Sequence, residues 1–166
     1  MWIMKGFFIG RFQPFHLGHF YAMQFALSKV DMLWVGIGSS NKKNEKRNPF
    51  NAIERKQMIL SSINKTLLRR IKIYLIPDFD DHSKWIDAIN YIVPKYDLVF
   101  SNDEITTSIC SKTSNVSTIR LHDRKILSGT NIRNKMISGD KWEELVPAGT
   151  KKVLRNINLK ERLSIL

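Results

Sequence analysis

The chain has 166 residues, of which 43% are hydrophobic and 25% are charged, as in an ordinary globular domain. No apolar run approaches the roughly 20 residues that span a bilayer, and the single cysteine, Cys110, has no partner for an internal disulfide. We therefore expect a cytoplasmic protein without a membrane segment. Lysine and arginine number 27 against 15 acidic residues, and the resulting charge of +12 favours an anionic ligand such as a nucleotide or a nucleic acid.

Apolar runs alternate with helical patterns from the N-terminus onward. The predicted strands, which are short runs rich in β-branched and aromatic residues, are 3–9, 32–37, 71–76, 98–100 and 117–121. The predicted helices are 19–30, 51–63, 83–93, 131–138, 142–146 and 149–163. Asn51 is expected to cap the second helix, with Glu54 completing a capping box.

This alternation predicts an α/β fold. It is typical of a Rossmann-like parallel sheet with helices on both faces, joined by right-handed crossovers. No repeat, low-complexity segment or linker divides the chain, so 1–166 is expected to form a single domain. From about residue 131 onward that domain is expected to be helical.

The connection between the first strand and the first helix has an unusual composition, GRFQPFHLGH at 10–19. In open parallel sheets, ligands bind beyond the carboxyl ends of the strands, which is where this loop lies. His16 and His19 are three residues apart, so their rings should lie on a similar side of the helix start. Arg11 offers a planar fork for a phosphate, and Gly18 leaves room for one at the helix N-terminus.

Two other interpretations of the histidine pair are open. The histidines could bind a metal, but no nearby Cys, Asp or Glu completes a ligand set, and the zinc pattern H-E-x-x-H is absent. Alternatively, His16 could be an N-cap and His19 an ordinary surface side chain, as a lone histidine often is. Because Arg11 and Gly18 surround the pair, the segment favours a phosphate site over both.

A second candidate phosphate site is SGTNIR at 128–133. Ser128 is a natural N-cap, and the free N–H groups of the next turn, with the hydroxyls of Ser128 and Thr130, can hold phosphate oxygens. Arg133 lies one turn on, within reach of the same anion. Taken alone, this segment is explained equally well by a capped helix with a surface arginine.

Taken together, the two segments resemble the H-x-G-H and S/T-x-x-R signatures of the nucleotidyltransferase superfamily. Within it, the chain is similar to the archaeal-type nicotinamide-mononucleotide adenylyltransferases over nearly its whole length. The similarity includes R-N-P-F at 47–50 followed by Glu54 and Arg55, the stretch 76–85, and GDKWEELVP at 139–147.

The resemblance implies transfer of the adenylyl group of ATP to nicotinamide mononucleotide (NMN), giving NAD and pyrophosphate. Related members accept nicotinic acid mononucleotide. The 5′-phosphate of NMN would attack the α-phosphorus of ATP in line, without a covalent enzyme intermediate. Such a reaction needs positioning and charge stabilisation more than a nucleophile, and Mg²⁺ is expected to bridge phosphates and solvent with few or no protein ligands.

The resemblance also implies roles for the matched positions. His16, His19 and Arg11 would be catalytic, with His19 stabilising the transition state directly. Arg11 and Arg47 would hold the β- and γ-phosphates, and the SGTNIR segment would bind the triphosphate from the opposite side. The residues expected to bind ATP are Gly10, Arg11, Phe12, Pro14, His16, His19, Arg47, Ser128, Gly129, Thr130 and Arg133.

The remaining expected contacts concern the two nucleosides. Gly10, Phe12 and Pro14 would shape the adenosine side of the site. Trp85 would stack on the nicotinamide ring, and Asp80 would make a polar contact to NMN. The expected partners are therefore ATP and NMN, with no nucleic acid and no membrane. By family resemblance the protein would also be a homo-oligomer, possibly a hexamer.

Three alternatives use the same features. Another adenylyl- or cytidylyltransferase, acting on FMN or phosphopantetheine, would share H-x-G-H and differ in the acceptor pocket. A non-enzymatic RNA-binding domain would explain the charge, but it needs aromatic stacking on a sheet face or a recognisable RNA module, and the sequence shows neither. A class I tRNA synthetase also carries H-x-G-H, but 166 residues are too few for a full one.

Overall fold

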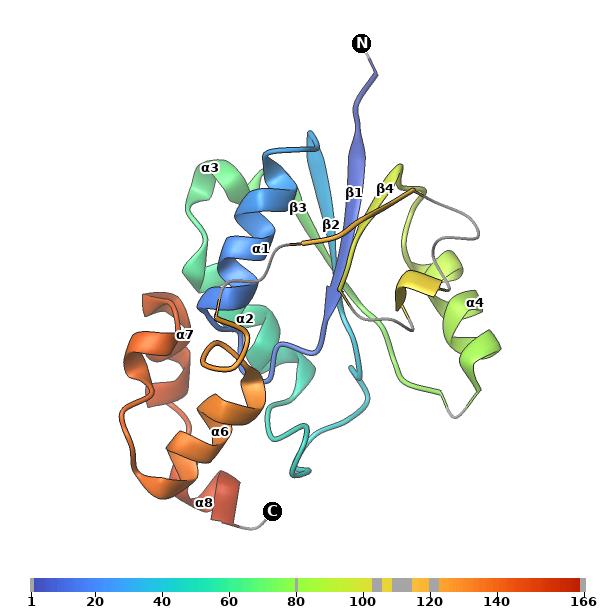
Figure 1. Ribbon diagram of the computed structural model, residues 1–166. Coiled ribbons are helices and arrows are strands. Elements are labelled where there is room, and N and C mark those ends of the chain that lie inside the picture. The colour runs from blue at the N-terminus through green and yellow to red at the C-terminus, as the bar shows by residue number, and fades with distance from the viewer. Residues whose placement is uncertain (1, 80, 103–105, 109–114, 120–122, 165–166) are drawn as a thin grey trace.

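The computed structural model describes residues 2–79, 81–102, 106–108, 115–119 and 123–164. Its centre is a sheet of five parallel strands in the order β3-β2-β1-β4-β5 (Figure 1). The strands are β1 (Lys5–Gly10), β2 (Met32–Ile37), β3 (Ile71–Leu75), β4 (Leu98–Phe100) and β5 (Asn115–Ser117). The strand order reverses between β1 and β4, which is the position where ligands bind in sheets of this kind.

Helices cover both faces of the sheet. They are α1 (Leu17–Leu27), α2 (Ala52–Ser62), α3 (Lys65–Leu68), α4 (His82–Ile92), α6 (Gly129–Ser138), α7 (Ala148–Arg155) and α8 (Leu159–Ser164), with a 3-10 turn at Glu143–Leu145. Figure 1 shows α1 and α2 on one side of the strands and α4 on the other. The predicted Rossmann-like α/β architecture is confirmed.

Each face of the sheet has its own hydrophobic cluster, because successive side chains on a strand point to opposite faces. Phe8 of β1 packs with α1 and α2 residues such as Met23 and Met58. The preceding Phe7 packs on the other face with Ile89 of α4. Burial on both faces explains why the strands read as continuous apolar runs rather than as alternating ones.

Two predicted helix caps are present and fix where α2 and α6 begin. Asn51 and Glu54 form the expected box: the Glu54 N–H donates to Asn51 Oδ1 at 2.9 Å, and the Asn51 N–H donates to Glu54 Oε2 at 2.9 Å. At α6, the Asn131 N–H donates to Ser128 Oγ at 3.2 Å. Each cap satisfies backbone donors that the first helical turn leaves open.

The fifth strand was placed wrongly by the sequence pattern. It covers Asn115–Ser117 and pairs with β4, where Phe100 lies opposite Ser117. Residues 118 and 119 of the predicted strand 117–121 lie beyond it, and 120–121 lie outside the described residues. Directly beyond that pair, the Asn102 side chain bonds the backbone of Ile119: its Oδ1 accepts from the Ile119 N–H at 2.8 Å, and its Nδ2 donates to the Ile119 carbonyl. A side-chain amide therefore replaces the backbone ladder where the strand was expected to continue.

The C-terminal part is helical as predicted, but its helices begin and end at other residues than expected. The helix expected over 149–163 is two helices, α7 and α8, and Asn158 Oδ1 accepts from the Glu161 N–H at the start of the second. The short helix α3 was not predicted. The segment expected as a helix at 142–146 is the 3-10 turn.

Among the C-terminal helices, α7 packs against α2 and α8 packs against α6 (Figure 1). At the α2–α7 contact, a Cβ on Gly149 would lie 2.1 Å from the carbonyl oxygen of Ser61. The two helix backbones are therefore so close at this point that only glycine fits. Arg162 of α8 forms an ion pair with Glu54 at 3.0 Å and donates to the Pro49 carbonyl at 3.2 Å. Among the described residues, no helix is both long and apolar enough to cross a membrane.

Candidate active site

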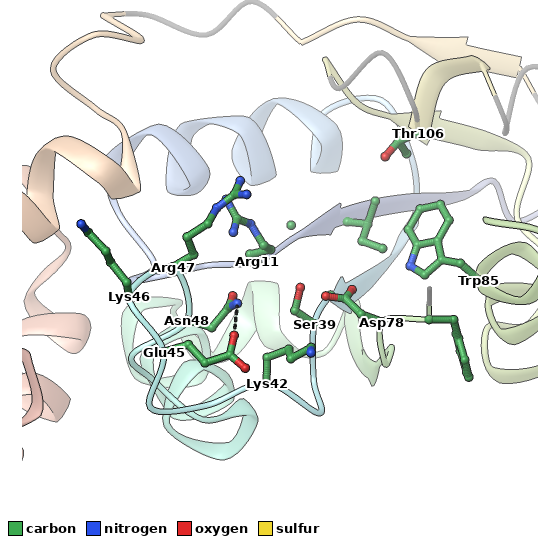
Figure 2. Close-up of a pocket in the computed structure, with 14 residues that line it drawn as sticks. Arg11, Ser39, Lys42, Glu45, Lys46, Arg47, Asn48, Asp78, Trp85 and Thr106 are labelled. Carbon is green, nitrogen blue, oxygen red and sulfur yellow. Dashed lines mark hydrogen bonds between the residues drawn. The ribbon is translucent and has the colours of Figure 1, made fainter. Parts of the chain in front are cut away.

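A pocket of about 920 Å³ opens at the carboxyl ends of the strands (Figure 2). It is lined by residues 9–11 at the end of β1 and by several residues between 38 and 48, after β2. Asp78 and Phe79 after β3 and Thr106 after β4 complete this part of the lining. Trp85 of α4 forms one end. The pocket thus lies where the topology of the sheet predicts a ligand.

Positive charge dominates the pocket. Its lining includes Arg11, Lys42, Lys46 and Arg47 against two carboxylates. In Figure 2, Lys46 lies at the end opposite Trp85, and the side chains of Arg11 and Arg47 lie between the two. Such a cluster of like charges is suited to a polyanion, because arginine and lysine bind phosphate oxygens through charge-assisted hydrogen bonds.

Arg133 of α6 belongs to the same cluster although it does not line this pocket. It is buried, and its pKa is lowered first by that burial and then by the charges of Arg11 and Arg47. The three guanidinium groups therefore lie within electrostatic range of one another. A triphosphate would relieve their mutual repulsion.

Gln13 joins the first loop to two other segments. Its side-chain amide pairs with the backbone of Phe50, donating to the carbonyl at 2.8 Å and accepting from the N–H at 3.0 Å. Its own carbonyl accepts a hydrogen bond from Arg133 Nη1 at 2.8 Å. The loop of Arg11, the R-N-P-F segment and α6 are thereby held together by one buried residue.

The two signature segments pack directly against each other. A Cβ on Gly129 would lie 2.9 Å from the Gln13 carbonyl oxygen, and one on Gly18 would lie 3.2 Å from the Leu127 carbonyl oxygen. Arg133 Nη2 also donates to Thr130 Oγ1 at 3.3 Å. Segments more than 100 residues apart are therefore brought together, as the phosphate-site hypothesis requires.

The histidine rings are stacked with centroids 3.6 Å apart and an interplanar angle of 25°. His16 is the residue before the first helical turn of α1, and its backbone N–H donates to His19 Nδ1 at 3.3 Å. Since that nitrogen is an acceptor, a neutral His19 carries its proton on Nε2. The spacing argument for rings on one side is confirmed, and His16 also occupies the N-cap position of the alternative interpretation.

Both histidines are held neutral. Burial lowers the pKa of His16 to about 4. Burial lowers the pKa of His19 well below its usual value, and the charge of a protonated His16 lowers it further. Among the described residues, His16 Nδ1 is buried without a hydrogen-bond partner.

The other predicted site residues fall into three groups. Gly10, Arg11 and Arg47 line the pocket, as does Trp85 at its far end. Phe12 and Pro14 are buried, and the Phe12 ring packs edge-on against His19 with centroids 4.8 Å apart. Asp80 lies outside the described residues.

Sequence reasoning assigned no role to three buried polar residues of this region, although all three stand in the quoted signature segments. Gln13 lies between Phe12 and Pro14 in the first loop, and a polar residue at that apolar position was the available signal. Arg55 is fully buried beneath the loops. Asn48 lines the pocket with its Nδ2 donating to Glu45 Oε2 at 3.2 Å, and its buried Oδ1 has no partner among the described residues.

Comparisons with known proteins identify the family. The cytidylyltransferase-like family model matches residues 7–135. The nicotinamide-nucleotide adenylyltransferase of Thermococcus kodakarensis is 35% identical, over 99% of this chain and 89% of its own length. That of Archaeoglobus fulgidus is 36% identical, over 96% and 95%.

A solved structure shares the fold. It is a bifunctional NMN adenylyltransferase/ADP ribose pyrophosphatase from Francisella tularensis, with a TM-score of 0.81, 20% identity, and coverage of 98% of this chain and 53% of that one. The near full-length relatives, together with the two joined signature segments, show that the chain belongs to the nicotinamide-nucleotide adenylyltransferase family.

Proposed function

We propose that this protein transfers the adenylyl group of ATP to NMN, forming NAD and releasing pyrophosphate. The observation that carries the proposal is the 2.8 Å hydrogen bond from Arg133 to the Gln13 carbonyl. It joins the S-G-T-x-I-R segment to the loop of Arg11 and His19, so one triphosphate could touch both. Relatives matched over nearly their whole length carry the name of this activity.

The reaction needs no nucleophile from the protein. An oxygen of the NMN 5′-phosphate forms the new bond to the α-phosphorus, and the bond from that phosphorus to the bridging oxygen of pyrophosphate breaks. We assign Arg11, Arg47 and Arg133 to the triphosphate, and the Nε2–H of neutral His19 to the charge that grows on the phosphate oxygens. Because NMN supplies an ionised phosphate, no general base is required.

The acceptor would bind at the Trp85 end of the pocket. Trp85 is half-buried and lines the cavity, so its ring can stack on the nicotinamide. Asp78 lines the same region and adds a hydrogen-bond acceptor that the sequence argument had not included. Nicotinic acid mononucleotide differs from NMN by a carboxylate in place of an amide, and we propose NMN as the preferred acceptor because Asp78 would repel that carboxylate.

We also propose that Mg²⁺ accompanies ATP, held mainly by phosphate oxygens and water. The carboxylate of Glu45, which lines the pocket, would orient water ligands of such an ion. The ion would neutralise part of the triphosphate charge.

The proposal is tested by incubating the protein with ATP, Mg²⁺ and one mononucleotide at a time. We expect NAD and pyrophosphate in equal amounts with NMN, and a lower kcat/KM with nicotinic acid mononucleotide. FMN and phosphopantetheine serve as controls for the other acceptors of the superfamily. Product from either of these, and none from NMN, would refute the assignment.

A homo-oligomer is part of the same proposal. The N-terminal segment exposes Trp2 and Ile3, at 80% and 52% of their surface, and large apolar side chains on a surface favour association. Light scattering during gel filtration would measure the assembly. A monomer at all concentrations would refute it.

A further inference from the structure

A buried arginine lies beneath the pocket that carries the exposed Arg11 and Arg47. Arg55 of α2 has no exposed surface and is among the largest fully buried side chains of the described chain. Arginine is almost never fully buried unless its donors are satisfied. Its partners therefore indicate its role.

The guanidinium of Arg55 is bonded to backbone carbonyls from three segments. Nη1 donates to the carbonyls of Arg11 and Gly38, each at 2.7 Å. Nη2 donates to Ser39 O at 3.0 Å, and Nε donates to Asn51 O at 3.2 Å. These carbonyls belong to the loop after β1, the turn after β2 and the start of α2.

Two of those segments form the floor of the pocket. Arg11, Gly38 and Ser39 all line it, and the Gly38 N–H donates to the Gly10 carbonyl at 2.9 Å. Ser39 has a positive φ of 49°, which a non-glycine residue adopts only when its surroundings hold it there. Arg55 supplies part of that support.

The side chain remains charged in spite of its burial. Burial lowers its pKa to about 10, with Asp78 and Glu54 raising it and the nearby Arg11 lowering it further. At neutral pH the group is therefore protonated. Carbonyl dipoles satisfy its donors without cancelling its charge, so a second positive charge stands behind Arg11.

We infer that Arg55 is a positioning residue for the triphosphate: it fixes the backbone of Arg11 and of the 38–39 turn, and it adds positive potential behind them without contacting the nucleotide. The activity readout of this inference rests on the proposed adenylyl transfer. Its binding readout does not, because ATP affinity is measured without an acceptor.

The chain offers a matched control in Arg70. This arginine also bonds several backbone carbonyls, donating to Asp31 O at 2.9 Å and to Leu27 O at 2.7 Å. It directly precedes β3, at the amino ends of the strands and away from the pocket. Replacement of Arg70 should lower the stability of the protein without changing its affinity for ATP.

The experiment compares Arg55→Lys, Arg55→Gln and Arg70→Lys with the unaltered protein. Unfolding by denaturant gives stability, calorimetry gives the Kd of ATP without NMN, and steady-state kinetics give KM for each substrate. We expect Arg55→Lys to weaken ATP binding about tenfold by losing the planar fork, and Arg55→Gln to weaken it further by also losing the charge. KM for NMN should change less than about twofold in Arg55→Lys, and Arg70→Lys should bind ATP normally.

The outcomes separate a positioning role from a purely structural one. An unchanged ATP Kd in folded Arg55→Lys, or equal losses for ATP and NMN, would overturn the inference. If Arg55→Gln does not fold, Arg55→Lys alone decides, since it keeps the charge and most of the volume. If the unaltered protein binds ATP but forms no NAD, the proposed function fails while the binding comparison still tests Arg55.

Discussion

Single side chains in this site are held by hydrogen bonds to backbone groups. The His19 ring receives the His16 N–H through Nδ1, and Arg133 reaches the carbonyl of Gln13. Gln13 in turn pairs with the backbone of Phe50. Side chains fixed in this way lose little further conformational freedom when a ligand binds, which favours catalysis by positioning.

The first prediction concerns the donor at Nε2. His19→Ala removes one group proposed to stabilise the transition state, so we expect kcat to fall by about two to four decades with a smaller change in KM. His19→Gln, which retains an N–H donor, should recover part of the loss. Steady-state kinetics with ATP and NMN measures both, and an unaltered kcat in a folded His19→Ala protein would contradict the role.

The second prediction concerns pH. His16 has a pKa of about 4 in the folded protein and an ordinary value near 6.5 when unfolded. Between these pH values the unfolded chain binds more protons than the folded protein. The contribution of His16 to the free energy of unfolding should therefore be fully present above pH 6.5 and should be lost as the pH is lowered toward 4. The loss from this group is on the order of 3 kcal/mol.

Denaturant titrations at several pH values in that window measure the loss. His16→Asn removes the titrating group, so the decline between pH 6.5 and 4 should be shallower in this variant than in the unaltered protein. Equal slopes for the two proteins would show that His16 does not carry the effect.

The third prediction concerns the acceptor end of the pocket. Trp85→Ala should raise KM for NMN about tenfold, the size expected for loss of one aromatic stacking partner, while KM for ATP changes little. Tyr91→Ala is the control, because Tyr91 lies on the same helix and is 92% exposed. An effect confined to ATP would place the acceptor elsewhere.

Motif residues were predictable from sequence to the extent that their chemistry is local. Arg11, His16 and Ser128 were identified because a loop after a strand and a helix start have recognisable compositions. Gln13 and Arg55 stand in the quoted segments but were given no role, since their partners are backbone carbonyls and amides of distant segments. Nothing in a sequence marks which carbonyl will lie opposite a given side chain.

The predictions of whole helices and strands were also right where the local sequence decides the structure and wrong where a distant or later residue does. The buried strands β2 and β4 were predicted with their observed bounds because each is a short apolar run with polar residues on both sides. β5 was displaced because an Asn102 side chain competes for the backbone of Ile119. The helix over 149–163 was divided by Asn158, whose capping role depends on where α7 ends.

The fourth prediction belongs to the packing of α7 on α2. A Cβ at position 149 would lie 2.1 Å from Ser61 O and 2.4 Å from the Ser62 nitrogen, so Gly149→Ala forces the helices apart. We expect the free energy of unfolding to fall by about 3 kcal/mol. Lys152→Ala, an exposed change on the same helix, should cost less than about 0.5 kcal/mol, and similar values for both would refute the close contact.

The charge of the molecule as a whole acts on both substrates. A net +12 with exposed Arg11 and Arg47 at the pocket attracts ATP and NMN, but ATP carries the larger negative charge. Attraction between exposed charges weakens as salt shortens the screening length. The positive potential around the pocket should therefore make KM for ATP depend more strongly on salt concentration than KM for NMN.

The fifth prediction states that difference. Raising ionic strength from about 0.05 M to about 0.3 M should increase KM for ATP several-fold and KM for NMN by a smaller factor. Lys152→Ala removes a charge from α7 and should leave the ATP dependence nearly unchanged. Equal salt dependences for ATP and NMN would mean that the cationic pocket does not steer the triphosphate.

The hydrogen bond between Arg133 and Gln13 spans 120 positions of the chain, and that separation has a consequence for synthesis. A ribosome releases the N-terminal strands first, and domains begin to fold as their segments emerge. The loop after β1 therefore lacks its contact with α6 until that helix has been translated, more than 100 residues later. A nascent chain would gain affinity for nucleotide only after Arg133 has emerged, so cellular ATP could stabilise finished copies while giving no support to prematurely terminated ones.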